Sequence, residues 1–129
     1  MLSELLANWR RKRALKQERV YVLANQLAEG RVMWARLRAS DVVPDETQVR
    51  LSFSYRAPGR GQAANLAQFL REETDYEVQA GEDSVTGTTQ AMTLNDDNLP
   101  GWTIWMVDTG YENGGCQFVG WGAASPTAG

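Results

Sequence analysis

The side chains that could do chemistry in this chain are a basic run, scattered carboxylates and one cysteine. The 129 residues contain no histidine and a single cysteine, Cys116, which we expect to be buried because no nearby group would lower its pKa. The commonest general base and the commonest zinc ligand are therefore missing. Acid–base catalysis would need a pair of carboxylates in a cleft, and no spacing here singles one out. We predict a protein that is not an enzyme and binds no cofactor.

Neither the carboxylates nor the glycines form a predicted ligand site. The "NDDN" at 95–98 and the "GED" at 81–83 lack the ligand spacing of a calcium loop. We expect solvated acids there, with Asp96 or Asp97 capping a helix. The "GRGQAAN" at 59–65 lacks the G-x-G-x-x-G spacing of nucleotide-binding loops. No metal or nucleotide site is predicted.

The charges are divided between the two halves of the chain. Residues 1–71 hold all 13 lysines and arginines against six acids, whereas residues 72–129 hold ten acids and no base. Such a layout favours binding to a charged partner, either RNA phosphates or an acidic protein, although a basic run can also be a solvated helix surface. Both interpretations stay open, because Arg13 and Lys16 occupy a helix face that is otherwise apolar. The densest basic run gives four candidate partner-binding residues: Arg10, Arg11, Lys12 and Arg13.

The first element expected to position this basic run is an N-terminal helix. Residues 2 to about 29 contain no proline, and Gly30 is placed to cap the helix end. A continuous helix of this length would run about 42 Å and overhang a domain whose radius of gyration is about 14 Å. We therefore expect that one half docks elsewhere, or that the helix breaks near "RRKRALK". Its apolar residues form two stripes: Leu2, Leu5, Leu6 and Trp9, then Val20, Leu23, Ala24 and Leu27.

The rest of the chain reads as strands alternating with helices. After a short connector or strand around 32–37, "VRLSFSY" at 49–55 alternates apolar and polar residues, as a strand with one buried face does. A helix follows the "APGRG" turn, and two strands, "DYEVQ" and "SVTGTTQAMTL", follow the helix. The apolar face of that helix consists of Ala63, Leu66, Ala67 and Leu70.

Segment 95–110 is ambiguous between a helix and a strand. The acids before Pro100 signal a helix start, whereas the β-branched and aromatic residues at 103–107 favour a strand. The topology favours the helix, because a helix ending at Gly110 and a final strand "CQFVGWGA" complete the order β-α-β-β-α-β. We predict an α+β, ferredoxin-like sandwich with a four-stranded antiparallel sheet and both helices on one face, preceded by the N-terminal helix.

The terminal "FVGWG" and this order of elements resemble the RraB-like family, the regulators of ribonuclease E activity B. The other matching pieces are "VYVLANQLAEG", "LSFSY" and "LAQFLREETDYEV". The family pattern is usually Tyr-Asp-Gly-Trp-Gly, so Phe118 and Val119 replace its tyrosine and aspartate. The resemblance implies a non-catalytic protein that binds and restrains an endonuclease of the ribonuclease E type. It also implies three parts: a helical segment at 1–30, a ferredoxin-like domain at 31–124 and a flexible tail at 125–129.

Trp121 stands between two glycines and has two interpretations. It could be an exposed aromatic anchor for a protein partner, since tryptophan is enriched at interface hot spots. In a regular strand Phe118 and Trp121 would face opposite sides of the sheet, whereas a bulge at Gly120 would turn both onto the core. We favour the bulge, and keep Trp121 as a candidate partner-binding residue beside the basic run.

The N-terminus bears on the compartment and on the alternative partners. Its short apolar run precedes the basic cluster, the reverse of a secretory signal, and no apolar run approaches the roughly 18 residues of a membrane span. We expect a cytoplasmic protein without a membrane partner. RNA is an alternative partner for the basic helix, but "VRLSFSY" has no aromatic pair on its solvent side, so base stacking is not expected. A homo-oligomer formed through the N-terminal helix is a further alternative.

Overall fold

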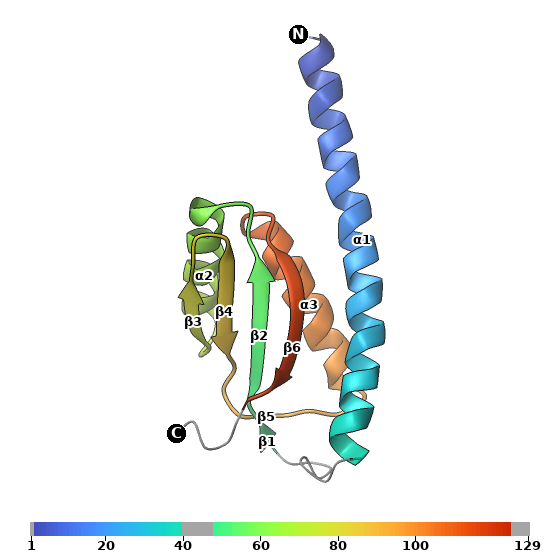
Figure 1. The fold of residues 1–129 in the computed structure, drawn as a ribbon, viewed down its shortest axis with the longest axis vertical. Helices are drawn as coiled ribbons and strands as arrows, with labels where there is room; N and C mark the ends of the chain where they lie inside the picture. The colour runs from blue at the N-terminus through green and yellow to red at the C-terminus, as the bar shows by residue number, and fades with distance from the viewer. Residues whose placement is uncertain (1, 40–47, 125–129) are drawn as a thin grey trace.

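Four antiparallel strands form the central sheet, and two helices cover one of its faces (Figure 1). The computed structural model describes residues 2–39 and 48–124, so the predicted tail at 125–129 lies outside the described residues. The ferredoxin-like order of elements is confirmed, with the strands arranged β3-β4-β2-β6. The strands are β2 (Leu51–Arg56), β3 (Glu77–Ala80), β4 (Ser84–Thr88) and β6 (Gln117–Ala123), and the covering helices are α2 (Arg60–Glu73) and α3 (Asn98–Glu112).

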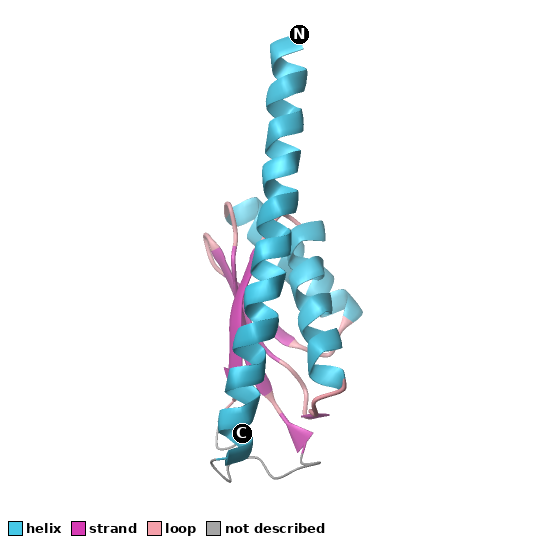
Figure 2. Ribbon diagram, turned by 90° about the vertical axis from the view of Figure 1, so that its right-hand side faces the viewer, coloured by secondary structure: helices cyan, strands magenta, loops and turns pink. Residues whose placement is uncertain are grey.

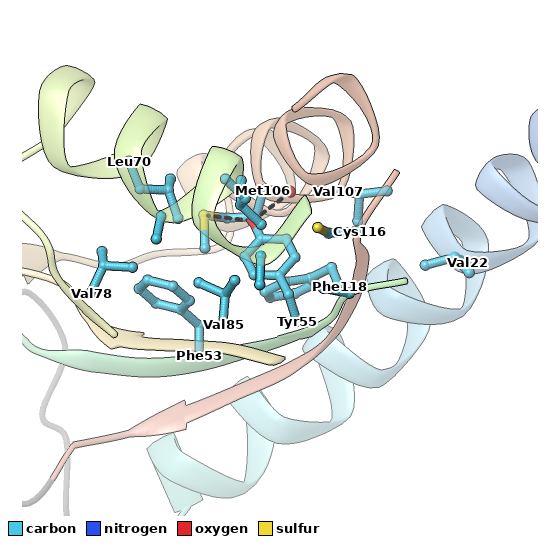
Figure 3. Close-up of a cluster of buried hydrophobic side chains, with 14 residues drawn as sticks. Val22, Phe53, Tyr55, Leu70, Val78, Val85, Met106, Val107, Cys116 and Phe118 are labelled. Atoms are coloured by element: carbon cyan, nitrogen blue, oxygen red, sulfur yellow. Dashed lines mark hydrogen bonds between the residues drawn. The ribbon is translucent and has the colours of Figure 1, made fainter. Parts of the chain in front are cut away.

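The core lies between the sheet and these two helices (Figure 3). In β2, Leu51, Phe53 and Tyr55 are buried and alternate with polar residues, as the sequence predicts. The hydroxyl of Tyr55 donates a hydrogen bond to the backbone carbonyl of Met106 at 2.6 Å. Burial raises the pKa of Tyr55 well above its usual value. The four residues predicted as the apolar face of α2 are all buried.

The ambiguous segment is a helix, and it runs two residues past the predicted end at Gly110. Its β-branched residues Thr103 and Val107 are buried against the sheet, so packing outweighs their strand propensity. Asp97 occupies the predicted N-cap position of α3, but its side chain makes no capping hydrogen bond. The side-chain oxygen of Asn95 accepts the hydrogen bonds from the backbone N–H groups of Asp97 and Asn98 instead, at 2.9 and 2.8 Å. Asp96 forms an ion pair with Arg38 instead, at 3.2 Å.

A small second sheet closes one end of the domain. Strand β1 (Gln48–Val49) pairs with β5 (Met92–Thr93), so the stretch expected as one long strand after residue 84 is two short ones. Thr89 lies between β4 and β5 in the chain, and its buried hydroxyl accepts a hydrogen bond from the backbone N–H of Leu51 at 3.0 Å. A second apolar cluster packs here, formed by Trp34, Val49, Leu51, Leu94 and Leu99.

The N-terminal helix α1 (Leu2–Ala39) is longer than predicted and does not break at the basic run. The predicted cap at Gly30 is wrong, because Gly30 lies inside the helix on its buried face with Val22, Gln26 and Trp34. The expected strand at 32–37 is also wrong, since Trp34 anchors this turn of helix in the second apolar cluster. The predicted boundary between residues 30 and 31 therefore falls within one helix.

The first half of α1 projects past every other element of the structure (Figures 1 and 2). Every side chain from residue 2 to residue 18 is exposed, and Arg19 is the first that is partly buried. We call residues 2–18 the arm; at 1.5 Å per residue it is about 26 Å long. The overhang expected from the length of the helix is thus present in the structure.

Replacing Gly30 with alanine is expected to stabilise the protein by about 0.5–1 kcal/mol, because alanine favours a helix interior. A Cβ atom at Gly30 would lie 3.6 Å from Nε1 of Trp121, an ordinary contact distance. Chemical denaturation of the wild type and of Gly30→Ala measures the difference. A helix that ended at Gly30 in a left-handed conformation would give a loss of stability instead.

Candidate partner-binding surfaces

The arm carries the four basic residues that the sequence singles out, and it holds them away from the domain. Arg10, Arg11, Lys12 and Arg13 are exposed, and none of the ion pairs found among the described residues involves them. The guanidinium of Arg13 lies 5.2 Å from the centre of the Trp9 ring, within the range of a cation–π contact. The basic run is thus free to meet an anionic surface.

The root of the arm is held by a cluster of charges at the end of α3. Arg19 reaches Asp108 at 2.7 Å and Glu112 at 3.3 Å, and hydrogen bonding to Asp108 raises the pKa of the guanidinium. One turn away, the hydroxyl of Tyr111 donates a hydrogen bond to Glu18 at 3.0 Å. Burial, followed by this bond to a carboxylate, raises the pKa of Tyr111. The cluster holds three carboxylates against one guanidinium, so it is acidic overall.

The predicted bulge in β6 is confirmed. Ser54 pairs with Gly120 and Tyr55 pairs with Phe118, which leaves Val119 without a residue opposite it. The extra residue brings Phe118 and Trp121 onto the same face of the sheet, as expected. One ring, that of Trp102, contacts both of them edge to face, with centroid distances of 6.1 and 6.3 Å.

Trp121 is half-buried and packs between the sheet and two helices. Its indole faces Gly30 of α1, and its ring contacts Trp102 of α3. Beside it, the side-chain amide of Gln26 donates a hydrogen bond to the carbonyl of Val119 at 3.0 Å and ties α1 to the bulge. Trp121 lies far from the exposed arm, so the structure does not join it with the basic run in one site.

Helices α2 and α3 leave the opposite face of the sheet uncovered (Figures 1 and 2). A hollow lies on that face. We call this hollow the sheet groove; its volume is about 690 Å³. Gly87 is part of its floor; a Cβ atom there would point to the core face, 2.5 Å from the ring of Phe53, so the glycine leaves room for that ring. The polar and small residues that line it are Ser52, Ser54, Glu77, Gln79, Thr86, Gly87, Thr88, Gly120 and Gly122. Phe53 and Trp121 also border it, but their rings lie on the core face of the sheet, where Trp121 packs against Trp102. The structure does not test Trp121 as a partner-binding residue, so that role stays a prediction.

The sheet groove was not predicted from the sequence. Each of its polar residues reads as the ordinary solvent side of an alternating strand. Only the pairing of the four strands shows that small side chains lie next to one another on one face of the sheet. The signal that was available is the pair of glycines around Trp121, which alternate with the core-facing ring and therefore lie on the open face.

The single cysteine and the potential metal-binding side chains are the other reactive groups to place. Cys116 is buried as predicted, and burial raises the pKa of its thiol, so a reactive thiolate is disfavoured. Across residues 2–39 and 48–124, no three potential metal-binding side chains come together. In the same part of the chain, no helix combines the length and the apolar character that crossing a bilayer requires.

Comparisons with known proteins add no further assignment. The chain matches no protein-family model, no curated protein and no solved structure.

Proposed function

We propose that this chain is a non-catalytic regulatory protein that binds a protein partner over the sheet groove. The observation that carries the proposal is the uncovered groove itself, whose floor includes the Gly-Trp-Gly strand. Its serines, threonines and glycines keep the backbone close to the surface, so larger side chains of a partner can enter and find hydrogen-bonding groups.

The chemistry of the sheet groove favours a protein over a nucleic acid. Its lining contains Glu77 and Gln79 but no lysine or arginine. Phosphate groups would find no lysine or arginine in this lining, whereas the amides and hydroxyls of a protein segment would find hydrogen-bonding groups. Arg50 reaches Glu77 from the rim at 3.7 Å, so the partner would meet a balanced ion pair and not an isolated acid.

The resemblance to RraB-like proteins supports an endonuclease of the ribonuclease E type as the partner. That resemblance is strongest in the strand that supplies Gly120 and Gly122 to the groove. Binding would act by masking, because a domain seated on the endonuclease would cover the surface that RNA or another protein needs.

A cleavage assay with a purified ribonuclease E type endonuclease and a single-stranded RNA substrate tests this proposal. The wild-type chain is expected to slow cleavage, and Thr86→Arg is expected to weaken the inhibition at least tenfold by filling the sheet groove. Ala64→Arg adds the same side chain at an exposed position of α2 on the other side of the domain, and should inhibit as the wild type does.

Two results would contradict the proposal. One is an unchanged cleavage rate in the presence of a large excess of the wild-type chain. The other is equal inhibition by Thr86→Arg and by Ala64→Arg, which would place the contact away from the sheet groove.

A further inference from the structure

We propose that two copies of this chain associate through α1 in an antiparallel, two-fold arrangement. The arm of each copy would lie along the second half of α1 in the other copy. The proposal stands on the arm and is independent of the function assigned to the sheet groove.

The first observation is a continuous stripe along α1 with the spacing of a coiled-coil seam. Its positions are separated by alternating steps of four and three residues. The spacing is symmetric about the midpoint between Ala14 and Leu15, so a two-fold axis there superposes the stripe on itself. The stripe consists of Leu2, Leu6, Trp9, Arg13, Lys16, Val20, Leu23 and Leu27.

The antiparallel register pairs large apolar residues at both ends of the seam. Leu2 of one copy meets Leu27 of the other, and Leu6 meets Leu23. Trp9 meets Val20 in the next layer inward. The apolar residues of each arm would therefore pack against apolar residues in the second half of α1 of the other copy, and the two-fold symmetry makes both contacts identical.

The residues of this seam are exposed along the arm and at Val20, and partly exposed beside the domain. Leu2, Leu6 and Trp9 are 74%, 48% and 57% exposed, and Val20 is 64% exposed. Leu23 and Leu27 are half-buried, and one side of Leu23 packs against the core of its own domain. The fully buried residues of α1 are others, from Val22 to Trp34 in steps of four, so the domain can keep its core while the exposed sides of the seam residues pair.

Charge selects the antiparallel orientation over the parallel one. Parallel arms would hold the two basic runs side by side, which like charges disfavour. In the antiparallel register Arg11 lies level with Glu18 of the other copy. Arg10 comes level with Arg19, but Glu18, Asp108 and Glu112 outnumber that arginine, so the basic run still meets a root cluster that is acidic overall.

The centre of the seam is polar. Arg13 of one copy meets Lys16 of the other, a like-charge pair that opposes association, although the long aliphatic stems can pack while the charged ends reach solvent. Polar residues at seam positions reduce stability but fix the register and the orientation of paired helices. The central layer therefore explains why the apolar stripe is interrupted at the point of symmetry.

The root cluster also argues against an anionic membrane or RNA as the occupant. Both would bring phosphate groups toward Asp108 and Glu112 as the helix approached along its seam. Neither would cover the part of the seam that lies beside the domain, from Val20 to Leu27. A second copy of the chain would cover both the half of the seam on the arm and the half beside the domain.

Disulfide trapping in the full-length protein tests the register. Residues 9 and 20 lie about 16 Å apart along one helix, too far for a disulfide within one chain. The double variant Trp9→Cys/Val20→Cys is therefore expected to form a covalent dimer on mild oxidation. The control Trp9→Cys/Tyr21→Cys moves one cysteine to an exposed position about 100° around the helix, and it should remain largely monomeric on a denaturing gel.

Light scattering with size-exclusion chromatography tests the association without cysteines. The wild-type chain should elute as a dimer, and Leu6→Glu should raise the dissociation constant at least tenfold. Leu15→Glu is the matched control, because Leu15 is also exposed on the arm but lies off the seam. This control should leave the dimer intact.

Several outcomes would overturn the proposal. A wild-type chain that is monomeric at about 100 µM would do so, whether or not it bound phosphatidylglycerol vesicles or a single-stranded oligonucleotide. Cross-linking of Trp9→Cys alone, as efficient as that of the double variant, would show parallel arms. An equal effect of Leu6→Glu and Leu15→Glu would remove the seam from the interface.

Discussion

Replacing Phe118 with alanine is expected to lower the free energy of unfolding by about 3–5 kcal/mol. The ring is fully buried, and it contacts Tyr55 and Trp102 with centroid distances of 5.2 and 6.1 Å. Alanine would leave a cavity between β6 and α3 that the surrounding rings can fill only in part. Urea or guanidinium titration followed by tryptophan fluorescence measures the change.

The neighbouring residue supplies the control for this experiment. Val119 is 46% exposed at the bulge, so Val119→Ala should change the free energy of unfolding by no more than about 0.5 kcal/mol. The contrast between two adjacent residues depends on the bulge. Similar losses for both variants would show that β6 pairs with β2 in another register.

Gly110→Ala is expected to destabilise the protein by about 2–3 kcal/mol, although alanine favours helices. A Cβ atom at this position would lie 2.6 Å from the carbonyl oxygen of Cys116 and 2.6 Å from the ring of Tyr55. Both neighbours are fixed, one by the backbone of the turn into β6 and the other by the core. The helix can relieve the overlap only by moving away from the sheet.

Gly101 lies in the same helix and gives the opposite expectation. It is exposed, and a Cβ atom added there would have no neighbouring atom within 4 Å. Gly101→Ala should therefore stabilise the protein by about 0.5–1 kcal/mol. Denaturant titration of the two variants should move the midpoint in opposite directions. A shift in the same direction would mean that α3 does not approach β6 as closely as the structure shows.

The sheet and its two covering helices could be predicted from local patterns. The alternation in β2 and the helical spacing in α2 both reflect a single buried face, and burial of that face is what stabilises them. Segment 98–112 carried conflicting signals. The order of elements resolved them, because β4 and β6 run parallel on either side of β2, and the usual crossover between parallel strands contains a helix.

The end of α1 could not be predicted from local patterns, because tertiary contacts decide it. Gly30 resembles a cap in the sequence, but in the structure it brings the helix against Trp121, and Trp34 then anchors the next turn. Asp96 is similar. In the sequence it resembles a cap, but in the structure it forms an ion pair with Arg38, which is 58 residues away in the chain. Contacts between residues so distant in the chain leave no trace in a short window of sequence.

Of the candidate surfaces, too, some could be predicted from the sequence and others could not. The basic run was visible in the sequence because consecutive charges need no fold to be recognised. The sheet groove was hidden because its lining comes from four strands spread over residues 52–122. The seam of α1 was visible only as two separate stripes, and the unbroken helix joins them.

At the bulge, the backbone of Val119 has a structural role that does not depend on its side chain. The backbone carbonyl of Val119 is held by Gln26, while its side chain points away from the core and contributes little to it. A different side chain at this position would meet solvent and would leave the strand in place. Position 119 is therefore where the side chain could change without refolding the strand, and where a label could be attached without disturbing the domain.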